Sequence, residues 1–234
     1  MADQTFVPGN FRRREFLQTV FSSAVAGAVA QTGLELVYPT ALPAQTTLTP
    51  ESGLQTLVEG NQRFCANQLT SFQQDLDILK NQTVAKQEPF AAVLSCADSR
   101  VPVELIFDQT IGHIFVTRVA GNIATPEIIA SLEYGVAVLG LKVLVVLGHG
   151  NCGAVKAGMK ADTVPGQISA LYQHLKPAVD QAGGNFEKAI QLNARYQADL
   201  LRTSSTVIKE AAKAGSLKVT SAVYELATGK VAFS

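Results

Sequence analysis

Residues 142–152 read Lys-Val-Leu-Val-Val-Leu-Gly-His-Gly-Asn-Cys. The run from Val143 to Leu147 is wholly apolar and rich in β-branched side chains, a pattern typical of a strand buried on both faces of a parallel sheet. After one glycine come His149 and, three residues later, Cys152. This segment therefore predicts a buried strand that delivers an imidazole and a thiol at its carboxyl end, with a helix beginning near Cys152.

A second segment of the same kind lies earlier in the chain. The apolar run from Phe90 to Leu94 ends at Ser95 and Cys96, and Asp98 and Arg100 follow directly. It predicts another buried strand with a thiol at its carboxyl end.

The rest of the chain alternates strand and helix patterns. We expect a strand over 113–119, helices over 49–67, 125–139 and 185–214, and a hairpin over 217–233 that turns at Thr228-Gly229. This alternation predicts an α/β fold: a single domain around a mostly parallel central sheet with flanking helices. Because sites in such sheets form beyond the carboxyl ends of the strands, the two polar segments are expected at one edge.

The two segments together offer a set of metal ligands. The thiols of Cys96 and Cys152 and the imidazole of His149 are the ligand types that Zn²⁺ accepts, and three protein ligands leave the fourth tetrahedral position open, as a catalytic site requires. Beside the first ligand, the guanidinium of Arg100 can hold the carboxylate of Asp98 in two hydrogen bonds. The sequence thus predicts an open zinc site with an oriented carboxylate at its rim.

Some alternatives remain open on these residues alone. A closed structural zinc site or a redox dithiol would use the same thiols, and His113 or His174 would then be a stray fourth ligand. Cys65 lies on the helix expected over 49–67 and is interpreted as a small apolar residue rather than a ligand.

Length and composition limit the classes of protein. The 234 residues are 47% hydrophobic, so one sizeable core is feasible, and the formal net charge is +0. The balanced charge gives no reason to expect nucleic acid as a partner. No apolar stretch reaches the roughly 18 residues expected of a transmembrane helix.

The first 44 residues differ from the rest and are interpreted as an export signal and linker, with residues 45–234 as the catalytic domain. Arg-Arg-Glu-Phe-Leu at 13–17 is a twin-arginine sequence, and an Ala-rich, weakly apolar run follows. Cleavage after Ala30 or Ala44 would release the protein into the bacterial periplasm, or into the thylakoid lumen of a photosynthetic source. An uncleaved signal would leave it attached to the membrane.

The motifs of the chain resemble those of the β-class carbonic anhydrases from about residue 50 to the end. The shared motifs are Gly60–Phe64, Ser95–Arg100, Arg118–Asn122, Glu133-Tyr134 and Gly148–Gly153. The resemblance implies one Zn²⁺ per subunit, held by Cys96, His149 and Cys152, with Asp98 and Arg100 as a catalytic dyad.

The resemblance also implies partners and a substrate pocket. Members form dimers, often assembled further, with the active site at the subunit interface. Gln87, Phe115 and Tyr134 fall at the spacings of the residues that line the carbon dioxide pocket in the plant-like branch, and Gly153 borders the second thiolate. The chain has no Trp, whereas members that place the aspartate on zinc pair this state with a Trp-containing bicarbonate pocket. We therefore expect the plant-like state, with water as the fourth ligand.

The implied activity is zinc-dependent, reversible hydration of carbon dioxide to bicarbonate and a proton. Two alternatives keep the same site: hydrolysis of COS or CS₂, and a zinc-binding protein that has lost turnover.

Overall fold

The computed structural model describes residues 46–71, 73 and 76–234. The export signal and linker predicted over 1–44 lie outside these residues, so that prediction remains untested. In the described part of the chain, no helix is long and apolar enough to cross a membrane.

A mixed sheet forms the centre of the described region. Its strand order is β2-β1-β3-β4-β5. The first four strands in this order pair in parallel, and β5 is antiparallel to β4. The strands are β1 (Ala91–Ser95), β2 (Ile114–Arg118), β3 (Val143–His149), β4 (Lys218–Tyr224) and β5 (Val231–Phe233). The predicted strands and the C-terminal hairpin are confirmed.

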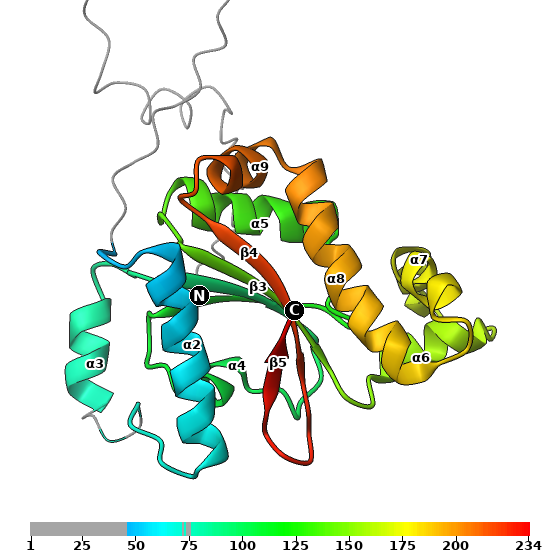
Figure 1. The fold of residues 1–234 in the computed structure, drawn as a ribbon, viewed down its shortest axis with the longest axis horizontal. Coiled ribbons are helices and arrows are strands. Elements are labelled where there is room, and N and C mark those ends of the chain that lie inside the picture. The colour runs from blue at the N-terminus through cyan, green and yellow to red at the C-terminus, as the bar shows by residue number, and fades with distance from the viewer. Residues whose placement is uncertain (1–45, 72, 74–75) are drawn as a thin grey trace, which may run out of the picture. The chain divides into compact units, whose positions relative to one another are not determined.

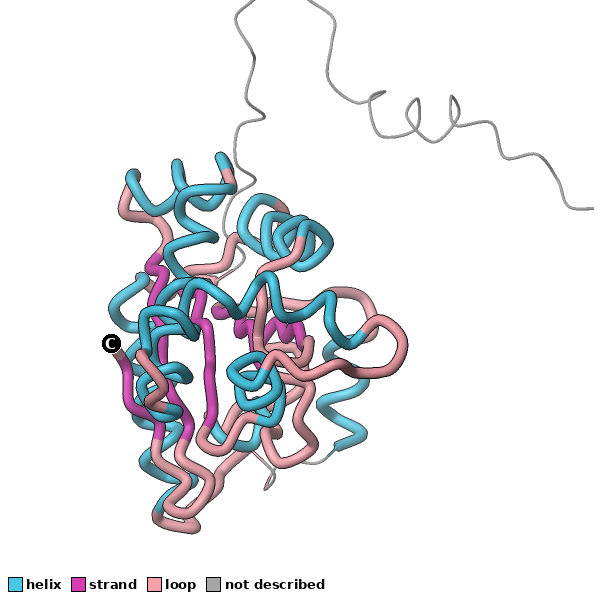
Figure 2. The backbone as a smooth tube through the Cα atoms, turned by 90° about the vertical axis from the view of Figure 1, so that its right-hand side faces the viewer, coloured by secondary structure: helices cyan, strands magenta, loops and turns pink. Residues whose placement is uncertain are grey.

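Helices cover both faces of the sheet (Figures 1 and 2). On one face lie α2 (Pro50–Cys65) and α4 (Val103–Ile106). On the other lie α5 (Pro126–Ala137), α8 (Phe186–Ser204) and α9 (Thr206–Lys213). Beyond the carboxyl ends of the strands are α6 (Gly153–Lys160), the 3₁₀ turn η1 (Ile168–Leu171) and α7 (Tyr172–Ala182). The remaining described helix is α3 (Leu76–Thr83).

The apolar run of β3 builds both halves of the core. Val143, Val145 and Leu147 pack into the cluster beneath α2 and α4. Leu144 and Val146 pack into the cluster beneath α5, α8 and α9. Successive side chains of a strand point to opposite faces, so an uninterrupted apolar sequence fits a strand that is covered on both sides.

The helical region expected over 185–214 is two helices rather than one. Ser205 separates α8 from α9 with an extended backbone, φ −103° and ψ 122°, and its hydroxyl accepts a hydrogen bond from the N–H of Ile208. The same hydroxyl donates to Glu133 on α5 at 2.6 Å. Serine is a strong N-cap, because its short side chain satisfies a free N–H of the first turn. Ser205 therefore ends α8, caps α9 and links the start of α9 to α5.

Candidate active site

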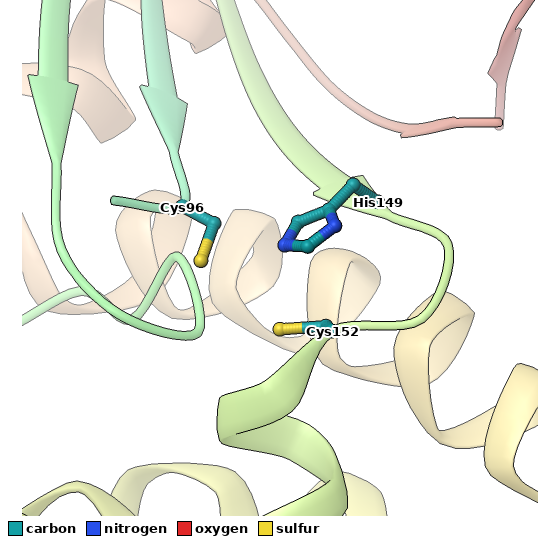
Figure 3. A group of neighbouring side chains, drawn as sticks. All are labelled: Cys96, His149 and Cys152. Atoms are coloured by element: carbon teal, nitrogen blue, oxygen red, sulfur yellow. The ribbon is translucent and has the colours of Figure 1, made fainter. Parts of the chain in front are cut away.

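The three sequence-predicted ligands meet at the carboxyl edge of the sheet (Figure 3). Cys96 directly follows β1, His149 is the last residue of β3, and Cys152 is the N-cap of α6. The pairing of Ser95 with Leu147 brings the ends of β1 and β3 level with each other. The ligand atoms lie within 4.8 Å of one another, and the three residues are 4%, 0% and 1% exposed.

This arrangement fits zinc. Tetrahedral zinc with Zn–S bonds of about 2.3 Å places two sulfurs about 3.8 Å apart, so small side-chain movements would close the observed group around an ion. Nδ1 of His149 lies 2.9 Å from the carbonyl oxygen of Gly150. Its Nε2 is buried and has no hydrogen-bond partner among the described residues. A buried ring nitrogen without a hydrogen-bond partner, beside two thiols, has a lone pair that could bind a metal.

The pKa values of the two thiols are shifted in opposite directions. The pKa of Cys96 is lowered to about 4, first by a hydrogen bond with the thiol of Cys152 and then, against the effect of burial, by contacts with His149 and the N–H groups of Gly121 and Asp98. The pKa of Cys152 is raised, because its thiol is the donor to Cys96 and because it is buried. The surroundings of Cys96 therefore favour its thiolate, the form that binds metal.

Asp98 and Arg100 form a two-point contact at the rim of the ligand group. Nε of Arg100 donates to Oδ1 of Asp98 at 2.9 Å, and a terminal guanidinium nitrogen donates to Oδ2 at 2.8 Å. The guanidinium holds the pKa of Asp98 well below its usual range. Oδ2 lies 3.8 Å from Nε2 of His149, so an ionised carboxylate that Arg100 holds in place borders the group formed by Cys96, His149 and Cys152.

Arg118 holds the backbone beside Cys96, a role that the residue-by-residue reading of the sequence missed. It ends β2, donates from Nε to the carbonyl oxygen of Cys96 at 2.9 Å, and donates from a terminal nitrogen to the carbonyl oxygen of Asp98. One guanidinium thus holds the backbone on both sides of Ala97. An arginine at the carboxyl end of the neighbouring strand was the available signal, since the ends of paired parallel strands are adjacent.

The remaining histidines and cysteine stand apart from the ligand group. His113 precedes β2 and lines a cavity of about 470 Å³ together with Arg63. His174 lies on α7, and its ring is next to the side chain of Gln173. Cys65, at the end of α2, is half-buried, and its thiol lies 3.9 Å from Oδ1 of Asn61. Among the described residues, only one group of three such side chains is close enough to hold a metal.

Three of the predicted pocket residues, Gln87, Phe115 and Tyr134, lie toward the other end of the sheet from the ligands within one chain. Gln87 is exposed in the loop before β1, whereas Cys96 follows the other end of this strand, which is about 13 Å long at the usual rise of 3.3 Å per residue. Phe115 on β2 and Tyr134 on α5 contact each other, with ring centroids 6.5 Å apart. Gly153 does lie beside the ligands, and a Cβ there would have no described atom within 4 Å.

Known proteins share this fold and sequence. The profile of the carbonic anhydrase family matches residues 91–231. Carbonic anhydrase 2 of Mycobacterium tuberculosis is 34% identical over 189 residues, which cover 77% of this chain and 91% of the relative. The carbonic anhydrase of Mycolicibacterium smegmatis is 33% identical over 192 residues, covering 78% of this chain and 92% of the relative.

Solved structures of β-carbonic anhydrases also share this fold. The β-carbonic anhydrase CcaA superposes with a TM-score of 0.62 at 28% identity, over 78% of this chain and 87% of the other. A structure described as one of two tetrameric β-carbonic anhydrases of Sordaria macrospora shares the fold, with a TM-score of 0.63 at 22% identity over 78% and 96% of the two chains. The chain belongs to the β-carbonic anhydrase family.

Proposed function

We propose that the protein catalyses the zinc-dependent, reversible hydration of carbon dioxide, in which CO₂ and H₂O give HCO₃⁻ and H⁺. One observation carries the proposal. Two buried thiols and an unpartnered imidazole nitrogen converge within 4.8 Å, beside a carboxylate that an arginine holds in two hydrogen bonds. Family membership supports the same reaction.

Cys96, His149 and Cys152 would hold the ion, one per subunit. When bound, zinc supplies a Lewis acid that makes a nucleophile of water near neutral pH. The hydrogen bond of Nδ1 to Gly150 fixes the ring of His149 and leaves Nε2 as the donor atom. Gly153 follows Cys152, and apart from its chain neighbours and its own helix backbone no described atom lies within 4 Å of where its Cβ would be, which supports an open approach for a small substrate there.

Asp98 would orient the attacking nucleophile. Because its pKa lies well below the usual range, the carboxylate is too weak a base to remove a proton at neutral pH. It is, however, always available to accept a hydrogen bond from the nucleophile and so aim a lone pair at CO₂. Arg100 would keep the carboxylate ionised and hold it by two hydrogen bonds, so that it does not itself bind the metal, and the released proton would pass to buffer.

The carbon dioxide pocket would be completed by a second copy of the chain. Gln87 and Cys96 lie at opposite ends of β1, so Gln87 is not beside the ligands of its own chain. Tyr134 is 48% exposed although it is large and aromatic, as expected of a residue that a partner covers. A homodimer or higher homo-oligomer with interfacial sites satisfies both observations, and the Sordaria macrospora relatives are described as tetrameric.

Stopped-flow measurement of CO₂ hydration at about pH 7 to 9, combined with metal analysis, tests the function. We expect activity that rises with zinc occupancy, and loss of activity with zinc retained in Asp98→Ala. Asp180→Ala is a matched control, since Asp180 pairs with Lys176 on the exposed surface of α7. A zinc-loaded wild type without CO₂ hydration would refute the proposal, and turnover of COS or CS₂ alone would reassign the substrate.

X-ray absorption at the zinc edge tests the ligand set separately. We expect two sulfurs and two lighter atoms at neutral pH. One sulfur and three lighter atoms would contradict the assignment of Cys96 and Cys152.

Export is proposed from the twin-arginine sequence alone. Fractionation of a bacterial host that carries the twin-arginine pathway is expected to place the wild type outside the cytoplasmic membrane, and Arg13→Lys combined with Arg14→Lys to keep it in the cytoplasm. Equal distribution of the two proteins would remove this proposal.

A further inference from the structure

The loop between β2 and α5 contacts the first metal ligand. The backbone N–H of Gly121 donates to Sγ of Cys96 at 3.3 Å. Gly121 has φ +79°, and a Cβ there would lie 3.1 Å from Leu175 and 3.3 Å from Ala154. The loop therefore approaches the sulfur through a backbone conformation that a larger residue would not accept.

Two buried amides of α8 hold this loop. Nδ2 of Asn193 donates to the carbonyl oxygen of Gly121 at 2.9 Å, and Oε1 of Gln197 accepts from the N–H of Ala124 at 2.9 Å. The two side chains are 1% and 0% exposed. The two side chains thus bind the loop at two points, Asn193 at a carbonyl oxygen and Gln197 at an N–H group.

The two amides also fix each other's orientation. Nε2 of Gln197 donates to Oδ1 of Asn193 at 3.1 Å and to the carbonyl oxygen of His174 at 3.0 Å. Oδ1 of Asn193 is thereby used as an acceptor, so its Nδ2 must face Gly121. Every described polar atom of the pair has a partner, and a fully satisfied buried network specifies one arrangement.

We propose that Asn193 and Gln197 are positioning residues of the zinc site, which act through Gly121 by keeping its N–H directed at Sγ of Cys96. The inference rests on the proposed metal site. A hydrogen bond to a coordinating thiolate stabilises its negative charge and fixes its direction, and partners of this kind contribute roughly 10- to 100-fold to metal affinity or activity. The ordinary alternative is that the amides only stabilise the packing of α8.

Asn193→Leu separates these readings, because leucine has a similar volume but cannot hold the carbonyl of Gly121. Asn61→Leu is the matched control. Asn61 is also buried, and it bonds to backbone groups of Ile106, Gly229 and Val231 and to the thiol of Cys65, none of which belongs to the ligand group or to the loop at Gly121. Both variants lose buried side-chain hydrogen bonds, so a purely structural role predicts similar consequences for both.

The first measurement is zinc release from the whole enzyme to a chromogenic chelator. We expect Asn193→Leu to release zinc roughly 10- to 100-fold faster than the wild type, and Asn61→Leu to release it at the wild-type rate. The second is the thiolate-to-metal charge-transfer band of the cobalt-substituted enzyme, expected to shift in Asn193→Leu and not in Asn61→Leu. Asn193→Ser is the milder variant to use should the leucine variant not fold.

Gln197→Met extends the test, since it removes the partner of Asn193 and leaves Gly121 untouched. As parts of one unit, the two substitutions together are expected to accelerate zinc release by less than the product of their separate effects. Equal zinc release and unshifted bands in the Asn193 and Asn61 variants would overturn the positioning role while leaving the metal site intact. A wild type that binds no zinc would instead refute the proposed function, and this inference with it.

Discussion

Asp108→Asn is expected to lower the free energy of unfolding by about 3 kcal/mol. The carboxylate follows α4, and its side chain is 0% exposed. Oδ1 accepts from the N–H and hydroxyl of Ser71 at 2.9 and 2.7 Å, and Oδ2 accepts from Nε of Arg63 at 2.5 Å and from the hydroxyl of Thr70 at 2.9 Å. The contacts tie the segment after α2 to the segment after α4.

The magnitude follows from these contacts. Asparagine retains the volume, and it tolerates the left-handed backbone of this position, φ +47°. Its oxygen can replace Oδ1, but its NH₂ group then faces the guanidinium of Arg63. Breaking a buried ion pair from one side costs about 3 to 5 kcal/mol. The lower end applies because the Arg63 side chain is 33% exposed and water can partly solvate it.

Thermal unfolding of the zinc-loaded protein measures the effect. At about 2 to 4 °C per kcal/mol for a domain of this size, the midpoint should fall by about 6 to 12 °C. The control is Asp180→Asn. The partner of Asp180, Lys176, is 70% exposed, and loss of this surface ion pair is expected to lower the free energy of unfolding by less than about 1 kcal/mol. Equal midpoints for the two variants would refute the assignment of Asp108 as a buried anchor.

Three further outcomes follow from the site and the core. His149→Asn is expected to abolish stoichiometric zinc binding, measured by metal analysis after dialysis, because it removes one of three donors. Arg100→Met is expected to reduce kcat/KM at least tenfold with zinc retained, since Asp98 loses both side-chain hydrogen bonds that hold it; unchanged kinetics would contradict the dyad. Leu201→Ala, at a position that is 0% exposed, is expected to cost about 2 to 5 kcal/mol in urea unfolding.

The free energy of unfolding should also depend on pH in the acidic range. Burial alone would raise the pKa of Asp108, but hydrogen bonds from Ser71, Arg63 and Thr70 outweigh it and hold the pKa well below the usual range. Such a group stabilises the fold fully above its unfolded pKa of about 3.9, and the contribution is lost as pH falls toward the lower folded value. Below about pH 4, the free energy of unfolding measured in urea should therefore fall more steeply with decreasing pH for the wild type than for Asp108→Asn. Parallel pH dependences for the two proteins would contradict this.

The sheet and the convergence of Cys96, His149 and Cys152 were predictable for the same reason. The continuous apolar runs before Cys96 and His149 indicate strands buried on both faces, and parallel strands must end at a common edge. The sequence pattern was therefore enough to bring together two segments that are far apart in the chain.

The supports of the site were not predictable in this way. Asn193 and Gln197 are polar residues on an amphipathic helix, where the ordinary interpretation is a solvated face, and only the packed structure shows that they are buried against the loop at Gly121. The break at Ser205 likewise depends on Glu133, a partner on another helix. Contacts that depend on tertiary packing leave little periodic trace in the sequence.

The placement of Gln87 and Cys96 at opposite ends of β1 makes catalysis, as proposed, a property of the assembly rather than of the chain. Each active centre would take its metal from one subunit and its pocket from the other. Two inactive proteins, Cys96→Ser and Gln87→Ala, should then restore each other's function when their subunits are exchanged, because a mixed pair contains one centre in which both halves are intact. In a cell, such sharing of active centres between subunits would be seen as genetic complementation between two defective alleles of the same gene.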